Sequence, residues 1–159
     1  MSHITIDVVM SGERLPELTF HVTATRLIAG ALASRDYSPL HHDSRYVADV
    51  VGQRDIFANT QFQAALFERY LTDWSGPAGR IARMKFKMIS SVFADDTVVL
   101  SGVVKEVFGL GPCGPAVSIM IEMTTGDRTA TTCEVLYALP AAADNDPWLR
   151  RGSNWLQLA

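Results

Sequence analysis

The sequence predicts an α+β fold in which a curved antiparallel sheet wraps around one central helix. Residues 60–71 are apolar on nearly all helical faces, a pattern typical of a buried helix rather than a surface helix. The second half of the chain is rich in β-branched residues and is divided by short turn sequences, which favours an antiparallel sheet. Because the helix and the sheet must each bury an apolar face, the economical packing curves the sheet around the helix.

Four segments of the second half have the residue patterns of strands joined into a meander. In the first segment, Met84, Phe86 and Met88 alternate with basic residues, which predicts one buried face and one solvated face. Turn sequences at residues 109–115 and 124–127 separate the later segments. The four segments are residues 83–88, 97–107, 117–123 and 129–139, and a weaker strand is expected at residues 18–22.

Two shorter helical segments are expected before the central helix. Thr23 is a good N-cap for residues 26–33, whose alanine and leucine content favours a helix. Pro39 ends this region because proline lacks a backbone N–H and excludes the preceding residue from helical geometry. A short helical turn over residues 44–50 then ends at Gly52.

The length of 159 residues predicts one domain with one hydrophobic core. We assign residues 1–140 to this domain and residues 141–159 to a C-terminal extension. The extension is rich in alanine, aspartate and asparagine, yet it carries Trp148 and Trp155, and disordered tails rarely contain tryptophan. It is therefore expected to dock onto a partner or onto its own subunit, with a frayed end as the alternative.

Charge and hydropathy exclude several classes of partner. Fourteen Lys and Arg against seventeen Asp and Glu give a net charge of −3, so no basic excess is present for nucleic acid. The longest uncharged apolar runs, residues 27–34 and 135–143, are under ten residues, whereas a membrane-spanning helix needs about 20. The first residues lack the pattern of a signal peptide, and only two cysteines occur. These features predict a cytoplasmic protein without a membrane span.

The densest group of reactive side chains lies within residues 35–43, immediately after the first predicted helix. Asp36 and His41 are five positions apart, and a loop bent at Pro39 turns both towards one point. With ordinary pKa values of about 4 and about 6.5, an aspartate and a neutral histidine form a general acid–base pair for one water. The alternatives are structural roles in the loop, or a metal site. A metal is disfavoured because adjacent histidines, His41 and His42, cannot easily chelate one ion and no second ligand cluster follows.

Residues 36–41, Asp-Tyr-Ser-Pro-Leu-His, resemble the Asp-x-Asn-Pro-Ile/Leu-His motif of the MaoC-like (R)-specific enoyl-CoA hydratases. The resemblance covers about residues 15–140 and implies the hot-dog fold, in which a sheet wraps around a long central helix. Residues 55–59 and 69–77 add a likeness to the smaller subunits of actinobacterial steroid side-chain enoyl-CoA hydratases, which pair with a different MaoC-like subunit.

The resemblance implies roles for individual residues. Asp36 matches the aspartate that activates the water, and His41 matches the histidine that orients this water and shuttles its proton. Asn59 falls where many members have the glycine of a His-Gly pair, whose backbone N–H polarises the thioester carbonyl at the start of the central helix. Ser38 replaces the motif's asparagine, and we expect it to contact the substrate. We also expect the hydrogen bonds that support this loop to differ from those in family members with asparagine.

The activity implied by the resemblance is hydration of a 2-enoyl-CoA thioester to a 3-hydroxyacyl-CoA, or the reverse dehydration, on a substrate that includes steroid side chains. No metal or redox cofactor is implied, because coenzyme A enters as part of the acyl-CoA substrate. The expected assembly is a homodimer, or a heterodimer with another MaoC-like subunit. Two alternatives remain open: a non-catalytic or half-catalytic subunit of a hetero-oligomeric hydratase, and a hot-dog acyl-CoA thioesterase.

Overall fold

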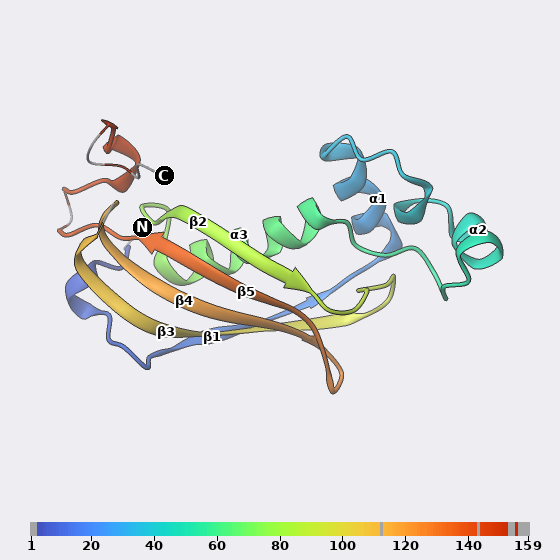
Figure 1. The fold of residues 1–159 in the computed structure, drawn as a ribbon, viewed down its shortest axis with the longest axis horizontal. Helices are drawn as coiled ribbons and strands as arrows, with labels where there is room; N and C mark the ends of the chain where they lie inside the picture. Colours follow the sequence, from blue (N-terminus) through green and yellow to red (C-terminus); the bar gives the residue numbers. More distant parts are fainter. Residues whose placement is uncertain (1–2, 112, 143, 153–154, 156–159) are drawn as a thin grey trace.

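Five strands form one antiparallel sheet whose concave face holds the longest helix, α3 (Figure 1). The computed structural model describes residues 3–111, 113–142, 144–152 and 155. The helices are α1 (Ala24–Ala33), α2 (Ser44–Tyr46) and α3 (Thr60–Ser75), and the strands are β1 (Arg14–His21), β2 (Arg80–Met88), β3 (Thr97–Gly111), β4 (Gly114–Thr125) and β5 (Arg128–Ala138). The predicted wrapping of a curved sheet around a central helix is confirmed.

The strand order across the sheet is β1-β3-β4-β5-β2, so the predicted four-strand meander is wrong for one strand. β3, β4 and β5 follow one another as expected, but β2 lies at the edge and pairs with β5. Residues 89–96 carry the chain around one end of the sheet before β3 begins, and they bury Val92 and Ala94 in the core (Figure 1). Residue alternation reports which face of a strand is buried but not which strand lies beside it, so the sequence pattern could not place β2.

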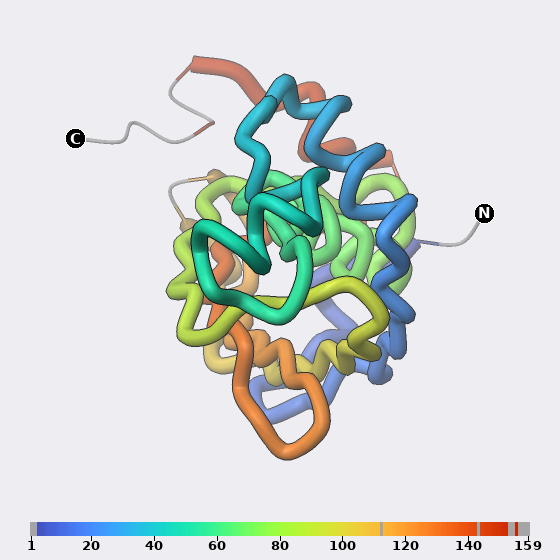
Figure 2. Tube along the Cα trace, turned by 90° about the vertical axis from the view of Figure 1, so that its right-hand side faces the viewer, coloured from blue at the N-terminus to red at the C-terminus, as the bar shows by residue number. Residues whose placement is uncertain are grey.

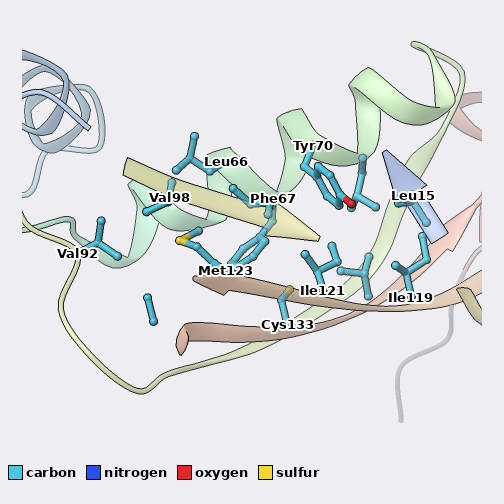
Figure 3. Close-up of a cluster of buried hydrophobic side chains, with 14 of the residues drawn as sticks. Leu15, Leu66, Phe67, Tyr70, Val92, Val98, Ile119, Ile121, Met123 and Cys133 are labelled. Carbon is cyan, nitrogen blue, oxygen red and sulfur yellow. The ribbon is translucent and has the colours of Figure 1, made fainter. Parts of the chain in front are cut away.

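The core lies between α3 and the concave face of the sheet. Leu66, Phe67 and Tyr70 of the helix belong to one buried cluster with Ile121 and Met123 of β4. Figure 3 shows Phe67 and Tyr70 pointing from the helix towards the sheet. All five are nearly inaccessible to solvent, with relative exposures of 6% or less. Burial of the large side chains on these two elements supplies most of the hydrophobic stabilisation that keeps the sheet curved around the helix.

The outer face of α3 is polar, which corrects the prediction that this helix is apolar on nearly all faces. The exposed residues of α3 include Gln61, Glu68, Arg69, Thr72 and Asp73. The apolar residues instead gather on the side that faces the sheet, as expected for an amphipathic helix. The helix also continues to Ser75 rather than ending at residue 71, and Gly76 ends it with a φ of 78°.

The predicted elements before α3 are present and gather at one end of the molecule. Thr23 caps α1 as expected, because its side-chain oxygen accepts a hydrogen bond of 3.2 Å from the N–H of Arg26. The helical turn expected over residues 44–50 is formed by α2 and a following wide turn that ends at Gly52. Figure 2 looks onto this end and shows α1, α2 and the start of α3 close together.

The described residues of the C-terminal extension dock onto their own subunit. The indole N–H of Trp148 donates to the carbonyl of Gly79 at 3.2 Å, just before β2 begins. The guanidinium of Arg80 lies over the Trp155 ring, 3.6 Å from its centroid, and 5.2 Å from the Trp148 centroid. Stacking of this kind is a cation–π contact. Both tryptophans therefore contact the start of β2, and docking of the extension onto a partner stays a prediction.

Arg150 holds the C-terminal extension against the body of the domain, and we predict that Arg150→Ala weakens this attachment. Its guanidinium donates to the carbonyls of Cys113 at 2.6 Å and Leu139 at 2.9 Å, which belong to the body of the domain. Loss of these charge-assisted bonds is expected to lower the free energy of unfolding by about 1–3 kcal/mol. Limited proteolysis should then cut within residues 141–152 faster than in the wild type. Arg151→Ala is the control, because the carbonyls that Arg151 contacts lie within the extension; equal cleavage of both variants would contradict the assignment.

Candidate active site

The loop between α1 and α2 brings Asp36 to the start of α3. The chain reverses at Arg35, whose φ of 56° lies in the left-handed region, and the N–H of Asp36 then donates to the carbonyl of Ala31 at 2.9 Å. A left-handed residue with such a bond is a common way to end a helix. This reversal turns the chain back along α1, so the next residues, with the Pro39 bend, run towards the central helix.

His41 is buried and has one defined orientation. It ends a short 3-10 turn that begins at Pro39, and only 7% of its surface is exposed. Its Nδ1 lies 2.7 Å from the carbonyl oxygen of Phe57, and a carbonyl only accepts, so Nδ1 carries the proton of this bond. The other ring nitrogen, Nε2, faces Asp36 Oδ2 at 3.3 Å. The Phe57 carbonyl therefore fixes the ring so that Nε2 is directed towards the Asp36 carboxylate.

The Asp36 carboxylate is held by donors on both of its oxygens. The side-chain amide of Asn59 donates to Oδ2 at 3.1 Å, and the N–H of Ser38 donates to Oδ1 at 3.3 Å. The pKa of Asp36 lies below its ordinary value, chiefly because of the hydrogen bond from Asn59. Partial desolvation raises this pKa. The Ser38 N–H and the two nearby histidines lower it further. Asp36 is therefore a carboxylate at neutral pH and accepts hydrogen bonds rather than donating them.

Asn59 is the N-cap of α3 and is 4% exposed. Its Oδ1 accepts a hydrogen bond from the N–H of Phe62 at 2.8 Å. Its backbone N–H has no acceptor among the described residues, and it stands at the positive end of a helix of 16 residues. The structure thus brings together three of the residues predicted from the sequence: Asp36, His41 and Asn59.

Ser38 is the predicted site residue that the structure does not bring into the cavity described below. It contacts Asp36 through its backbone N–H. Its side chain forms no hydrogen bond with any residue in the described part of the chain, and Ser38 does not line the cavity. The expected contact between Ser38 and a substrate therefore stays a prediction.

A cavity of about 360 Å³ opens beside the Asp36–His41 pair. The lining residues come from the loop after α1, from the first turn of α3 and from the end of β2: Asp36, His41, Phe57, Ala58, Asn59, Thr60, Gln63, Met88, Ile89, Ser90 and Ser91. The wall contains both polar and apolar groups. A ligand with a polar reacting group and an apolar body fits such a lining.

Gln63 is a site residue that the sequence analysis missed. It is 2% exposed, its Oε1 accepts from the hydroxyl of Thr131 at 2.5 Å, and its amide nitrogen lies 3.4 Å from the sulfur of Met88. One signal was available, because a glutamine on the apolar face of a buried helix needs a specific partner. Residues 88–91 gave no comparable signal, since only the strand order brings them to the start of α3.

Other reactive groups lie away from this pair. The described residues contain no group of three or more His, Cys, Asp or Glu side chains arranged to hold a metal ion. Cys113 and Cys133 are buried, and desolvation raises the pKa of both thiols, that of Cys133 to about 12. A thiol of this kind stays protonated at neutral pH and is a poor nucleophile. The Asp36–His41 pair is therefore the better candidate for chemistry.

Comparisons with known proteins agree with this fold. No family model matches the chain. The 3-oxo-4,17-pregnadiene-20-carboxyl-CoA hydratase beta subunit of Mycobacterium tuberculosis is 36% identical over 124 residues, which cover 78% of this chain and 93% of that protein. A chain of the crystal structure of the ChsH1–ChsH2 complex from the same organism superimposes with a TM-score of 0.76 and 30% identity, covering 83% of this chain and 99% of that chain.

More distant structures share the fold. The R-hydratase PhaJ1 from Pseudomonas aeruginosa has a TM-score of 0.78 at 18% identity, and the match covers 88% of each chain. The (R)-hydratase from A. caviae has a TM-score of 0.73 at 22% identity and covers 84% of this chain. In the part of the chain that the structure describes, no helix has both the length and the apolar character needed to cross a bilayer.

A curved sheet wrapped around one helix, with an aspartate and a histidine meeting at the start of that helix, defines a hot-dog protein of the hydratase type. The chain belongs to the MaoC-like hydratase family, as its identity to the Mycobacterium tuberculosis beta subunit over most of both chains establishes.

Proposed function

We propose that this chain hydrates a 2-enoyl-CoA thioester to a 3-hydroxyacyl-CoA and catalyses the reverse dehydration. The observation that carries the proposal is the 3.3 Å approach of Asp36 Oδ2 and His41 Nε2 at the wall of a cavity that also contains the N-cap of α3. Two proton acceptors side by side provide a place for one water molecule, whose two O–H groups donate to them. Asp36 and His41 are the catalytic residues of this proposal.

The proposed reaction moves one proton from water to carbon. The water oxygen attacks C3 of the enoyl group while Asp36 accepts one proton of the water, and the electrons of the double bond move to the thioester oxygen. The proton that Asp36 accepted passes from Oδ2 to Nε2 of His41, 3.3 Å away, and His41 then gives it to C2 of the enolate as the thioester carbonyl re-forms. Atoms and charges balance without a metal or redox cofactor, because the water supplies both the hydroxyl and the proton, and coenzyme A is part of the substrate.

The start of α3 stabilises the charge that develops on the thioester oxygen in this proposal. The backbone N–H of Asn59 has no acceptor among the described residues, and the helix dipole places partial positive charge at this end. One preorganised donor of this type is worth about 3–4 kcal/mol in the transition state. The backbone donor does not depend on the side chain, so asparagine serves this purpose as well as glycine does.

We also propose that the substrate is a steroid side-chain enoyl-CoA and that a second MaoC-like subunit completes the site. The relative with 36% identity is named as the beta subunit of a hydratase for such a thioester, and the structure with 30% identity is a complex of two named components. A cavity of about 360 Å³ holds the reacting end of a steroid thioester but not the whole molecule. We propose that the second subunit contacts the remainder.

The test compares the chain alone with the chain co-expressed with a MaoC-like partner subunit. Loss of absorbance at the enoyl-thioester band measures hydration, and light scattering measures the mass of each sample. We expect a stable heterodimer with hydratase activity, and little or no activity for the chain alone. A thiol reagent in the same assay detects release of free coenzyme A. Hydration removes the band without releasing thiol, whereas a thioesterase removes the band and releases one thiol for each thioester cleaved. Loss of the band matched by stoichiometric thiol release would overturn the hydratase proposal in favour of a thioesterase.

A further inference from the structure

The side chain of Asn59 is fully engaged inside the site. Its Oδ1 accepts from the N–H of Phe62 at 2.8 Å, while its Nδ2 donates to Asp36 Oδ2 at 3.1 Å and to Ser34 Oγ at 3.0 Å. The amide has one orientation that satisfies these contacts, because the reversed orientation would set its N–H groups against the N–H of Phe62. The capping bond between Asn59 Oδ1 and the N–H of Phe62 therefore fixes the amide so that Nδ2 donates to Asp36.

Ser34 anchors this contact to α1. The Ser34 hydroxyl lies 2.9 Å from the carbonyl oxygen of Gly30 and 3.1 Å from that of Ala31, so it donates to the last turn of α1 and accepts from Asn59. Asn59 therefore links the end of α1 to the start of α3, and the Asp36 carboxylate lies between the two helices. A bond network tied to two helices holds its members more rigidly than a loop alone does.

We propose that Asn59 is a positioning residue for the hydration reaction, and that its side-chain amide holds the Asp36 carboxylate aimed at the water beside His41. This inference rests on the proposed function. It is separate from the role proposed for the backbone N–H of Asn59, which acts on the thioester oxygen. The two roles belong to different groups of one residue and can be tested separately.

The charged groups around Asp36 explain why a neutral donor matters. His41 and His42 face the carboxylate and attract it only when they are protonated, and Arg35 is the exposed residue next to it in the chain. The Asn59 amide does not titrate, so its hydrogen bond favours the ionised carboxylate at every pH. This bond is also the largest of the effects that lower the pKa of Asp36. The amide thus holds the Asp36 carboxylate independently of the two histidines.

The resemblance places a glycine at this position in many family members, and glycine has no side chain with which to donate. In this chain one side chain both caps α3 and holds the carboxylate. The residue type follows from these two demands, because aspartate would cap the helix but repel Asp36, and serine would cap it without reaching Asp36. Asparagine satisfies both.

The test is Asn59→Ser, assayed in the complex with the partner subunit. Serine keeps an N-cap oxygen and the backbone N–H but removes the amide donor. We expect kcat/KM at neutral pH to fall about ten- to hundredfold, mainly through kcat, because the carboxylate loses its fixed position. We also expect the acid limb of kcat/KM to move to higher pH. The carbon-13 resonance of the Asp36 carboxyl should titrate at higher pH than in the wild type.

Asn59→Asp is the companion variant. It keeps the shape and the cap, but it places a second carboxylate beside Asp36, so one of the two carboxylates should titrate at a markedly higher pH. Thermal melting of both variants reports whether the fold is intact. The inference would be overturned if the Asn59→Ser variant had the same acid limb of kcat/KM and the same carbon-13 titration of Asp36 as the wild type. The titration needs no activity, so it decides the inference even if the wild-type complex fails to hydrate an enoyl-CoA, a result that would overturn only the proposed function.

Discussion

Asp36→Asn is expected to lower kcat for hydration about 10³-fold, the largest effect of any single substitution in this chain. The asparagine side chain has the same shape as aspartate but cannot accept the proton of the attacking water, and general-base catalysis is typically worth about 10²- to 10⁴-fold. KM should change little, because the carboxylate acts on the water rather than on the thioester. The enoyl-thioester absorbance assay with the assembled complex measures both constants.

His41→Ala provides the partner measurement, since His41 Nε2 lies 3.3 Å from the Asp36 carboxylate. If the two residues act on one water, the double variant should be little slower than either single variant, because groups that act as a unit are not additive. Asp73→Asn, on the exposed outer face of α3, is the matched control and should retain wild-type activity. Full activity in both Asp36→Asn and His41→Ala would refute the proposed pair.

Phe67→Ala is expected to have the largest effect on stability. Phe67 is fully buried between α3 and the sheet, and its ring lies 5.6 Å from that of Phe86 on β2. Truncation of a buried phenylalanine typically costs about 3–5 kcal/mol, because transfer energy is lost and a cavity remains. For a domain of this size, that loss lowers the melting temperature by about 10 °C. Urea titration followed by circular dichroism measures the change in the free energy of unfolding.

Leu110→Ala is the matched control for this measurement, since Leu110 is 97% exposed. A change within about 0.5 kcal/mol is expected there, because a solvated side chain has little burial energy to lose. A loss below about 1 kcal/mol for Phe67→Ala would mean that the sheet does not depend on α3 for its hydrophobic face.

The elements of this fold were predictable because their signals are local. Thr23 and Gly52 mark the boundaries of helical segments through chemistry that acts within one turn. The alternation of Met84 and Phe86 with basic residues likewise depends on neighbouring positions of one strand. The position of β2 beside β5 was not predictable in this way, since strand pairing joins segments that are far apart in the chain.

The residues of the candidate site also differ in how well the sequence could predict them, depending on whether they are close together in the chain. Asp36 and His41 lie close together in the sequence, so one bent loop and a family resemblance were sufficient to pair them. The cavity wall formed by residues 88–91 was beyond such reasoning, because it depends on where β2 ends relative to α3. The donor from Asn59 to Asp36 also joins two segments that are distant in the chain.

The sequence by itself determined the α+β class, the central helix and the closeness of Asp36 and His41, because periodicity, capping and short loops are properties of neighbouring residues. Only the tertiary structure decided the strand order, the polar outer face of α3, the contacts of the extension with β2 and the hydrogen bond from Asn59 to Asp36. Each of these depends on which distant groups meet when apolar surface is buried, and that is a property of the whole chain rather than of any segment.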